Sequence, residues 1–167
     1  LAAIPGAVAA VRAVAAAAIP HCVVSQSRRV RIDTNLRHIG LDAVFGARVY
    51  STHDLGKPKP APDIYLRAAA DFGVAPARVA VIEDTVTGVA GGVAAGMRVL
   101  GYAADAAPGS LTAAGAAEAP APSSPLASGN PRWKSLYGRS IRKSQAVQKL
   151  CGPSPLLLPI WNSCMTS

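Results

Sequence analysis

Residues 79–97 read Val79-Ala-Val-Ile-Glu-Asp-Thr-Val-Thr-Gly-Val-Ala-Gly-Gly-Val-Ala-Ala-Gly-Met97. An apolar run ends here in two adjacent carboxylates, Glu83 and Asp84, and a stretch of small residues follows at once. This pattern predicts a buried strand that opens directly into a helix. In an open α/β sheet, the carboxyl ends of the strands border the ligand crevice. The sequence therefore places two carboxylates where such a fold binds its ligand.

Neighbouring carboxylates repel each other unless a cation lies between them, because like charges disfavour joint ionisation. A hard divalent cation suits oxygen ligands, and Mg2+ usually takes only one or two protein carboxylates. We therefore expect Glu83 and Asp84 to hold Mg2+. The structural alternative is that Asp84 caps the following helix and Glu83 is solvated. The glycine pair 91–92 indicates close packing of that helix on a sheet rather than a phosphate cradle.

Two upstream stretches carry further polar side chains at the ends of predicted elements. A short apolar strand ends in Ser25-Gln-Ser-Arg-Arg29, and Gly56-Lys-Pro-Lys-Pro-Ala-Pro-Asp63 places two lysines in a proline-rich loop before a helix. Hydroxyl groups donate to phosphate oxygens, an ammonium group neutralises their charge, and paired carboxylates hold Mg2+. Together the three stretches suit the binding of a phosphoryl group.

In their order along the chain, these stretches resemble the haloacid dehalogenase-like hydrolases, in particular the subgroup of β-phosphoglucomutase and many sugar-phosphate phosphatases. That family shows a strand ending in Ser near a second Ser or Asn, then Lys-Pro-Ala-Pro-Asp-Ile-Tyr/Phe, then Glu-Asp-Ser-x-x-Gly and Ala-Ala-Gly-Met. The resemblance covers roughly residues 4–118. The matching segments are Val24-Ser-Gln-Ser27, Lys59-Pro-Ala-Pro-Asp-Ile-Tyr65, Glu83-Asp-Thr-Val-Thr-Gly88 and Ala94-Ala-Gly-Met97.

The resemblance implies a role for each matching residue. Ser25 would bind the transferring phosphoryl group, and Lys59 would stabilise its charge. Lys57 competes for that role, but the spacing to Pro62-Asp63 favours Lys59 and leaves Lys57 as a solvated neighbour. Arg28 and Arg29, at the start of the predicted helix 28–38, suit a second phosphate or a carboxylate of the substrate, although arginines that open an exposed helix are more often merely solvated. The expected metal ligands are Glu83 and Asp84, and the expected substrate-binding residues are Gln26, Ser27 and Arg28.

One motif of the family has no counterpart in this sequence. Family members carry Asp-x-Asp-Gly-Thr near their amino terminus, and its first Asp is the covalent nucleophile; no such string occurs in this chain. We expect this nucleophile to lie outside the chain and the chain by itself to be inactive. The resemblance implies a Mg2+-dependent phosphatase of a small phosphorylated metabolite, a sugar phosphate first of all, acting through an aspartyl-phosphate. The alternatives are a phosphomutase of the β-phosphoglucomutase kind and a non-catalytic remnant that binds phosphate or a partner.

Before Ala119 the chain alternates between strands and helices, which predicts a parallel sheet with helices on its faces. We therefore expect a Rossmann-like α/β core over residues 1–118, with Ser25, Lys59 and Glu83 at one edge. The predicted helices lie near 5–18, 28–38 and 62–72 and over Val86, Val89 and Val93, and the predicted strands at 21–25, 49–50, 78–82 and 98–102.

Composition limits the setting of this protein. Apolar residues make up 50% of the chain and aromatic residues only 5%, so Ala and Val must build most of the core. Three unevenly spaced cysteines do not form a disulfide framework, which favours a reducing, cytoplasmic location. No segment has the length and apolarity of a membrane span, so we expect no membrane partner.

From Ala119 onward the composition changes. Residues 119–167 hold half of the 14 prolines, both tryptophans, six basic residues and no acidic residue. The body therefore has eleven basic and nine acidic residues, and the net charge of +8 belongs mainly to the tail. We expect a disordered basic tail or an out-of-frame translation. A nucleic-acid-binding arm is disfavoured because no recognisable binding fold accompanies it.

The tail allows a prediction at the level of the gene. Leu111–Glu118 is typical of the last helix of the family's core, which leads into one more strand, and Ala119-Pro-Ala-Pro cannot supply the hydrogen bonds of that strand. We predict that another reading frame just after the Glu118 codon encodes an apolar strand followed by a Leu-rich helix. The nucleotide sequence tests this directly. If both alternative frames stop early or lack the pattern, the tail is a genuine basic extension.

Overall fold

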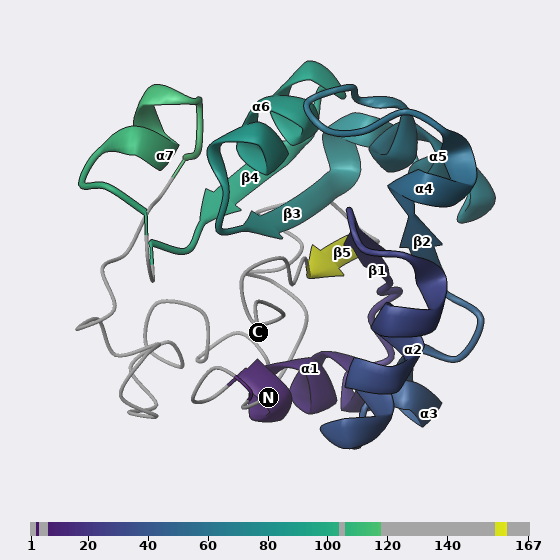
Figure 1. The fold of residues 1–167 in the computed structure, drawn as a ribbon. Helices are drawn as coiled ribbons and strands as arrows, with labels where there is room; N and C mark the ends of the chain where they lie inside the picture. The colour runs from purple at the N-terminus through teal and green to yellow at the C-terminus, as the bar shows by residue number, and fades with distance from the viewer. Residues whose placement is uncertain (1–2, 4–6, 104–105, 118–155, 160–167) are drawn as a thin grey trace.

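The computed structural model describes residues 3, 7–103, 106–117 and 156–159 of the 167-residue chain. Parallel strands alternate with helices along the chain, as the sequence predicted (Figure 1). The elements are α1 (Ala7–Ala16), β1 (Val23–Ser25), α2 (Arg29–His38), α3 (Asp42–Phe45), β2 (Val49–Ser51), α4 (Thr52–Leu55), α5 (Asp63–Asp71), the 3-10 turn η1 (Pro76–Arg78), β3 (Val79–Glu83), α6 (Val86–Ala94), β4 (Arg98–Gly101), α7 (Ser110–Ala113) and β5 (Leu156–Pro159).

The strands form two sheets, each with parallel pairing. In one sheet β1 pairs with β2, and Ser25 lies opposite Ser51. In the other sheet β3 pairs with β4 on one side, with Glu83 opposite Gly101, and with β5 on its other side. Since each pair is parallel, Ser25 and Ser51 end their strands at one edge, and Glu83 and Gly101 do the same in the second sheet.

β5 lies within the predicted tail, where the sequence indicated no strand. It pairs with β3 in parallel and also contacts β1, so it lies between β3 and β1 (Figure 1). The other residues of 119–167 lie outside the described part of the chain, and their disorder stays a prediction. Among the described residues, no helix has both the length and the apolar character needed to span a bilayer.

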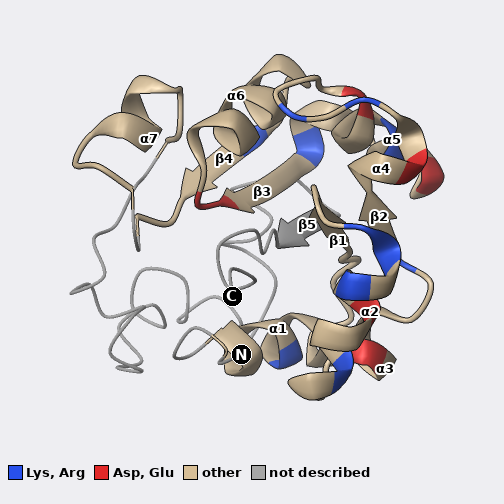
Figure 2. Cartoon of the chain, in the orientation of Figure 1, with Lys and Arg blue, Asp and Glu red and all other residues tan. Residues whose placement is uncertain are grey.

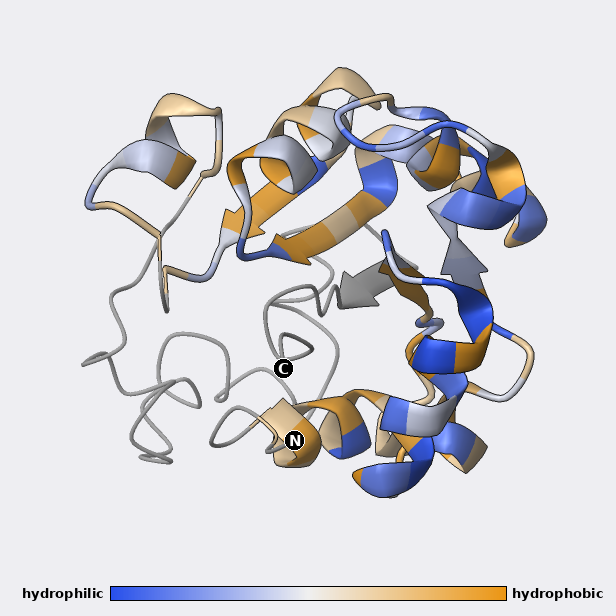
Figure 3. Ribbon diagram, in the orientation of Figure 1, coloured by the Kyte–Doolittle hydropathy of each residue, from blue (hydrophilic) through white to orange (hydrophobic). Residues whose placement is uncertain are grey.

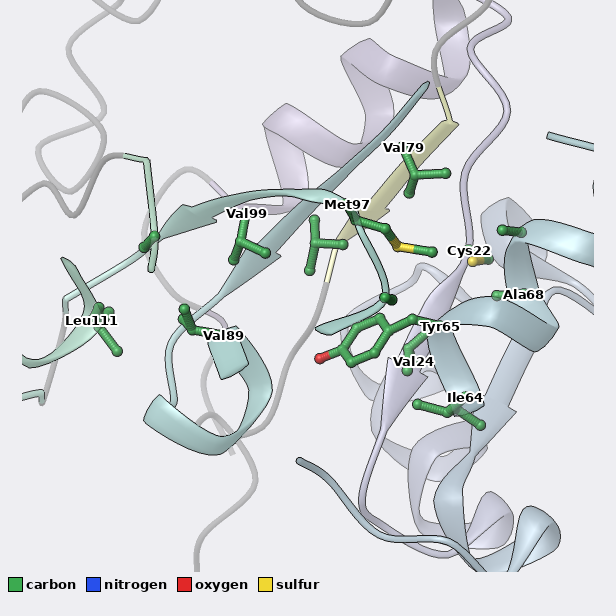
Figure 4. Close-up of a cluster of buried hydrophobic side chains, with 14 residues drawn as sticks. Cys22, Val24, Ile64, Tyr65, Ala68, Val79, Val89, Met97, Val99 and Leu111 are labelled. Carbon is green, nitrogen blue, oxygen red and sulfur yellow. The ribbon is translucent and has the colours of Figure 1, made fainter. Parts of the chain in front are cut away.

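Two apolar clusters hold the elements together. One cluster packs α5 and α6 against β3 and β4, and contains Tyr65, Val81 and Val89 (Figure 4). The other packs α1, α2 and α3 against β1 and β2, and includes Ile32 and Phe45. Figure 3 shows the result in hydropathy: β1 and β3 are largely apolar, whereas α2 is largely hydrophilic and buries only one stripe.

The α6 helix packs closely on the sheet. A Cβ atom on Gly92 would lie 2.8 Å from Cγ2 of Val99 in β4, and one on Gly91 would lie 2.9 Å from the ring of Tyr65. Both contacts are too short for any larger residue. The interpretation of these glycines as packing residues is therefore confirmed.

Candidate functional site

Glu83, the last residue of β3, is fully buried and both of its carboxylate oxygens accept hydrogen bonds from the protein. Oε1 accepts from the Lys59 ammonium and from the Tyr65 hydroxyl, the latter at 3.1 Å. Oε2 accepts from the backbone N–H groups of Asp84 (3.1 Å) and Thr85 (3.2 Å), and from the Thr85 hydroxyl (3.0 Å). The alternative of a solvated Glu83 is therefore wrong, because this carboxylate is the centre of a buried network.

The turn between β3 and α6 forms part of the space that the Glu83 carboxylate occupies. Thr85 is the N-cap of α6, and its side chain accepts a hydrogen bond from the N–H of Gly88 at 3.1 Å. Asp84 is therefore not the cap, so that alternative is also wrong. A Cβ atom on Gly88 would lie 2.0 Å from Cδ of Glu83, so only glycine leaves room for the carboxylate here.

Lys59 lies in the proline-rich loop before α5, and neither its side chain nor that of Glu83 is exposed (0%/0%). Burial lowers the pKa of the Lys59 ammonium from its usual value, and the Glu83 carboxylate opposes this shift. An ammonium group has three donors, and among the described residues Glu83 accepts from one of them. Lys57 instead forms an exposed ion pair with Asp63 at 2.5 Å.

The predicted phosphate-binding loop after β1 adjoins the Lys59 loop. Ser25 is fully buried, and its hydroxyl oxygen accepts a hydrogen bond from the N–H of Ser27 at 3.1 Å. The Gln26 side chain donates to the backbone oxygen of Lys59 at 3.3 Å. The Ser51 hydroxyl at the end of β2 donates to the backbone oxygen of Ser27 at 2.8 Å. The structure therefore joins the loops of Ser25 and Lys59, whereas Arg28 is exposed at the far end of the same loop.

Asp84 is half-buried beside this network, and its charge, like that of Glu83, opposes the lowering of the Lys59 pKa by burial. Within the described ranges, no group of three or more His, Cys, Asp or Glu side chains comes together as a metal cluster. Both oxygens of Glu83 accept hydrogen bonds within the protein. One carboxylate suits Mg2+, which keeps several waters. The metal-ligand assignment of Glu83 and Asp84 stays a prediction.

Two residues of the network were not predicted as site residues, namely Tyr65 and Gly88. The Tyr65 hydroxyl shares its hydrogen between Glu83 and the backbone oxygen of Gly88, at 3.1 and 2.9 Å. Burial, followed by the Glu83 charge, raises the pKa of Tyr65 strongly, so the hydroxyl stays protonated and can donate. The Lys59 ammonium lies 5.3 Å from the centre of the Tyr65 ring. In the sequence, the only sign of a role was that both residues lie in the motifs that resemble those of the family.

A sheet of parallel strands with helices on its faces is the fold of the Rossmann-like proteins, and here a buried lysine, a serine and two carboxylates lie in its adjoining loops. A sequence model described as haloacid dehalogenase-like hydrolase matches residues 1–96. Because this match covers more than half of the chain, the protein belongs to the haloacid dehalogenase-like hydrolase family. The expected family is confirmed.

Several curated relatives are named as phosphatases or as a phosphomutase. The chain is 42% identical over 91 residues to β-phosphoglucomutase of Mycobacterium tuberculosis, a match that covers 53% of this chain and 34% of that protein. It is 30% identical over 105 residues to 6-phosphogluconate phosphatase of Escherichia coli, covering 63% and 46%. It is 34% identical over 105 residues to hexitol phosphatase A of Escherichia coli, covering 62% and 47%. The chain thus spans less than half the length of these relatives.

Solved structures support the fold. A haloacid dehalogenase family hydrolase from Deinococcus radiodurans, with bound phosphate and sodium, matches with a TM-score of 0.64 and 38% identity, over 70% of this chain and 53% of that one. A haloacid dehalogenase-like protein from Agrobacterium tumefaciens matches with a TM-score of 0.66 and 36% identity, over 82% and 61%. The predicted Rossmann-like α/β fold is therefore confirmed.

The buried pair gives a prediction about stability. Lys59→Met or Glu83→Gln should each lower the free energy of unfolding by about 3–5 kcal/mol, because each leaves a buried polar partner uncompensated. The double variant should lose less than the sum of the two single losses. Urea unfolding followed by circular dichroism measures all three. The matched control is the exposed pair: Lys57→Met should cost about 1 kcal/mol or less. Equal losses for Lys57→Met and Lys59→Met would contradict the buried-pair interpretation.

Tyr65 gives a prediction about pH. Tyr65→Phe should lower the free energy of unfolding at neutral pH by about 0.5–1.5 kcal/mol through the lost hydrogen bond. Above the ordinary tyrosine pKa of 10.0, unfolded Tyr65 releases its proton while folded Tyr65 keeps it, so stability falls as pH rises. The variant should therefore lose stability less steeply than the parent chain above that pH. Lys59 contributes the opposite sign but is present in both proteins, so their difference isolates Tyr65. If the urea midpoints of the two proteins fall in parallel as pH rises, Tyr65 is not responsible for the loss of stability.

Proposed function

We propose that this chain is part of a Mg2+-dependent phosphatase that acts on a small phosphorylated metabolite, with sugar phosphates as the first candidates. The observation that carries the proposal is the Lys59 ammonium, which is buried against Glu83. The side chain of Gln26, the residue after Ser25, donates a hydrogen bond to the backbone oxygen of Lys59 and so joins the two loops. A cation held in a water-poor site interacts strongly with a developing phosphoryl charge. Relatives named as sugar-phosphate phosphatases support the substrate class.

Each side chain would have a defined part in phosphoryl transfer. The Ser25 hydroxyl and the Lys59 ammonium would donate to the oxygens of the transferring group, and Gln26, Ser27 and Arg28 would contact the rest of the substrate. Glu83 would favour the charged form of Lys59 and fix the position of its ammonium group. Glu83 and Asp84 would hold Mg2+. The metal would offset the negative charge of nucleophile and substrate. The attacking carboxylate would come from an Asp outside this chain, and water would hydrolyse the resulting acyl phosphate.

The same proposal also concerns the binding partner and the cellular location of the protein. The partner is a small anionic molecule, in the cytoplasm, and neither a membrane nor a nucleic acid is required. A phosphomutase is the second candidate, supported by the match to β-phosphoglucomutase. A chain that binds phosphate without turnover is the third.

One experiment separates these candidates. The chain, completed with its upstream coding sequence, is assayed for release of inorganic phosphate from a panel of sugar phosphates, with Mg2+ or with EDTA. We expect Mg2+-dependent release, and Asp84→Asn should raise the Mg2+ concentration needed for half-maximal activity. Isomerisation of a hexose phosphate without phosphate release would identify a mutase. If neither reaction occurs, the third candidate remains, a chain that binds phosphate without turnover.

The 167-residue chain by itself serves as the control. Losing a nucleophile can lower the rate by a factor on the order of 10^6, so we expect no significant turnover from it. Robust turnover that is lost in a folded Lys59 variant would show that another residue attacks phosphorus. An unchanged Mg2+ requirement in Asp84→Asn would remove Asp84 from the metal site.

A further inference from the structure

The place between β1 and β3, called here the strand slot, is occupied by β5, which lies far from both strands in the sequence (Figure 1). On their other edges β1 is paired with β2, and β3 with β4. Within the described part of the chain, β5 forms a ladder with β3 alone, and the edge of β1 that faces away from β2 has no paired strand. The slot is therefore filled by a strand that only one of its two neighbours holds through strand pairing.

The two strands that border the slot are buried and apolar. Val23 and Val24 of β1, and Val79 and Val81 of β3, are all buried. A strand with parallel neighbours on both sides and helices over its faces is typically a continuous apolar run. Residues 156–158 of β5 are three leucines, which agrees with this pattern. The slot therefore suits a short apolar strand that runs parallel to β3.

β5 is nevertheless poorly suited to a central place in a sheet. It has four residues and ends in Pro159, and Pro155 directly precedes it. Proline has no N–H group to donate to a ladder, so it is normally confined to edge strands and strand ends. The described chain before β5 ends at Ala117, and closing such a long connection costs conformational entropy. Another segment could therefore replace β5 more easily than it could replace β1 or β3.

The carboxyl end of the slot borders the candidate site. Pro159 lies opposite Ile82, so a strand in the slot that is one residue longer reaches the level of Glu83. On the other side of the slot, β1 ends at Ser25. Figure 2 shows the acidic end of β3 in red at this edge. Because residues 119–167 contain no acidic residue, β5 brings no carboxylate to the site.

We propose that β5 is an exchangeable strand, which fills the slot in this chain and is displaced by a parallel apolar strand that ends in an aspartate. Segments add to the edges of sheets in this way through main-chain hydrogen bonds. The incoming strand would pair with β3 and with the unpaired edge of β1, and would so join the two sheets. Its aspartate rests on the proposed function, as the attacking carboxylate. β5 would thus keep the site incomplete until it is displaced.

The test measures binding of a fluorescent peptide, Lys-Lys-Gly-Val-Val-Ile-Val-Asp-Gly, to the full chain by anisotropy. A tethered β5 competes at an effective concentration on the order of millimolar, so weakening β5 should strengthen peptide binding. Leu157→Pro removes a donor from the middle of β5 and should tighten binding about tenfold or more. The matched control is Leu126→Pro, outside β5, which should bind the peptide like the parent chain. Amides of residues 79–83 should exchange more slowly when the peptide is bound.

Equal affinity of Leu157→Pro and the parent chain for the peptide would overturn the proposal. Equal binding of a peptide with proline in place of isoleucine would also overturn it, because that peptide cannot complete a ladder. If Leu157→Pro does not fold, Leu157→Gly keeps the N–H group and weakens the strand less, so it should tighten binding about twofold to fivefold. A folded Leu157→Gly without this gain would contradict the exchange equally.

A peptide with asparagine in place of aspartate separates this proposal from the proposed function. A third carboxylate beside Glu83 and Asp84 is repelled unless a cation lies between them, so Mg2+ should tighten binding of the aspartate peptide and not of the asparagine peptide. If Mg2+ changes neither affinity, the attacking aspartate and the metal site of the proposed function are wrong, and the exchange of β5 stands. The exchange is measured without turnover, so an inactive complex does not count against it.

Discussion

The polar edge of this protein depends on one interaction, the ion pair of Lys59 and Glu83 inside the fold. Removing two charges from water is expensive, and their attraction compensates only when the remaining hydrogen-bonding groups also find partners. Here the carboxylate has four further bonds from Tyr65, Asp84 and Thr85. Burial then lowers the pKa of the ammonium, while Glu83 opposes the change. The pair is therefore held by its neighbours as much as by its own attraction.

This constraint explains the sequence around the site. Gly88 is required because the carboxylate occupies the space of a side chain, and Thr85 is suited because it both caps α6 and donates to Glu83. The three chain segments that meet here come from the ends of β1 and β3 and from the loop before α5. Each alone is an ordinary loop, and the hydrogen bonds of Gln26 and of Glu83 with Lys59 join the three loops.

The sequence predicted the strand–helix units well, because the apolar runs are long enough to show their period. It missed α3 and α4, whose four residues are too short for any period, and β5, whose pairing with β3 joins distant parts of the chain. Glu83 and Asp84 looked alike in the sequence because they are adjacent. Their different surroundings depend on Gly88, Tyr65 and Lys59, and only the three-dimensional structure shows which carboxylate points inward.

The burial of Lys59 also has a consequence for covalent labelling. An amine-reactive reagent, or an acetylating enzyme, needs an exposed and unprotonated lysine nitrogen. Lys59 has no exposed side-chain surface, whereas Lys57, two residues earlier on the same loop, has 61%. The two amines therefore differ in accessibility while sharing almost the same peptide. The labelling ratio of Lys59 to Lys57 in a single proteolytic fragment would report how often this edge of the protein opens in solution.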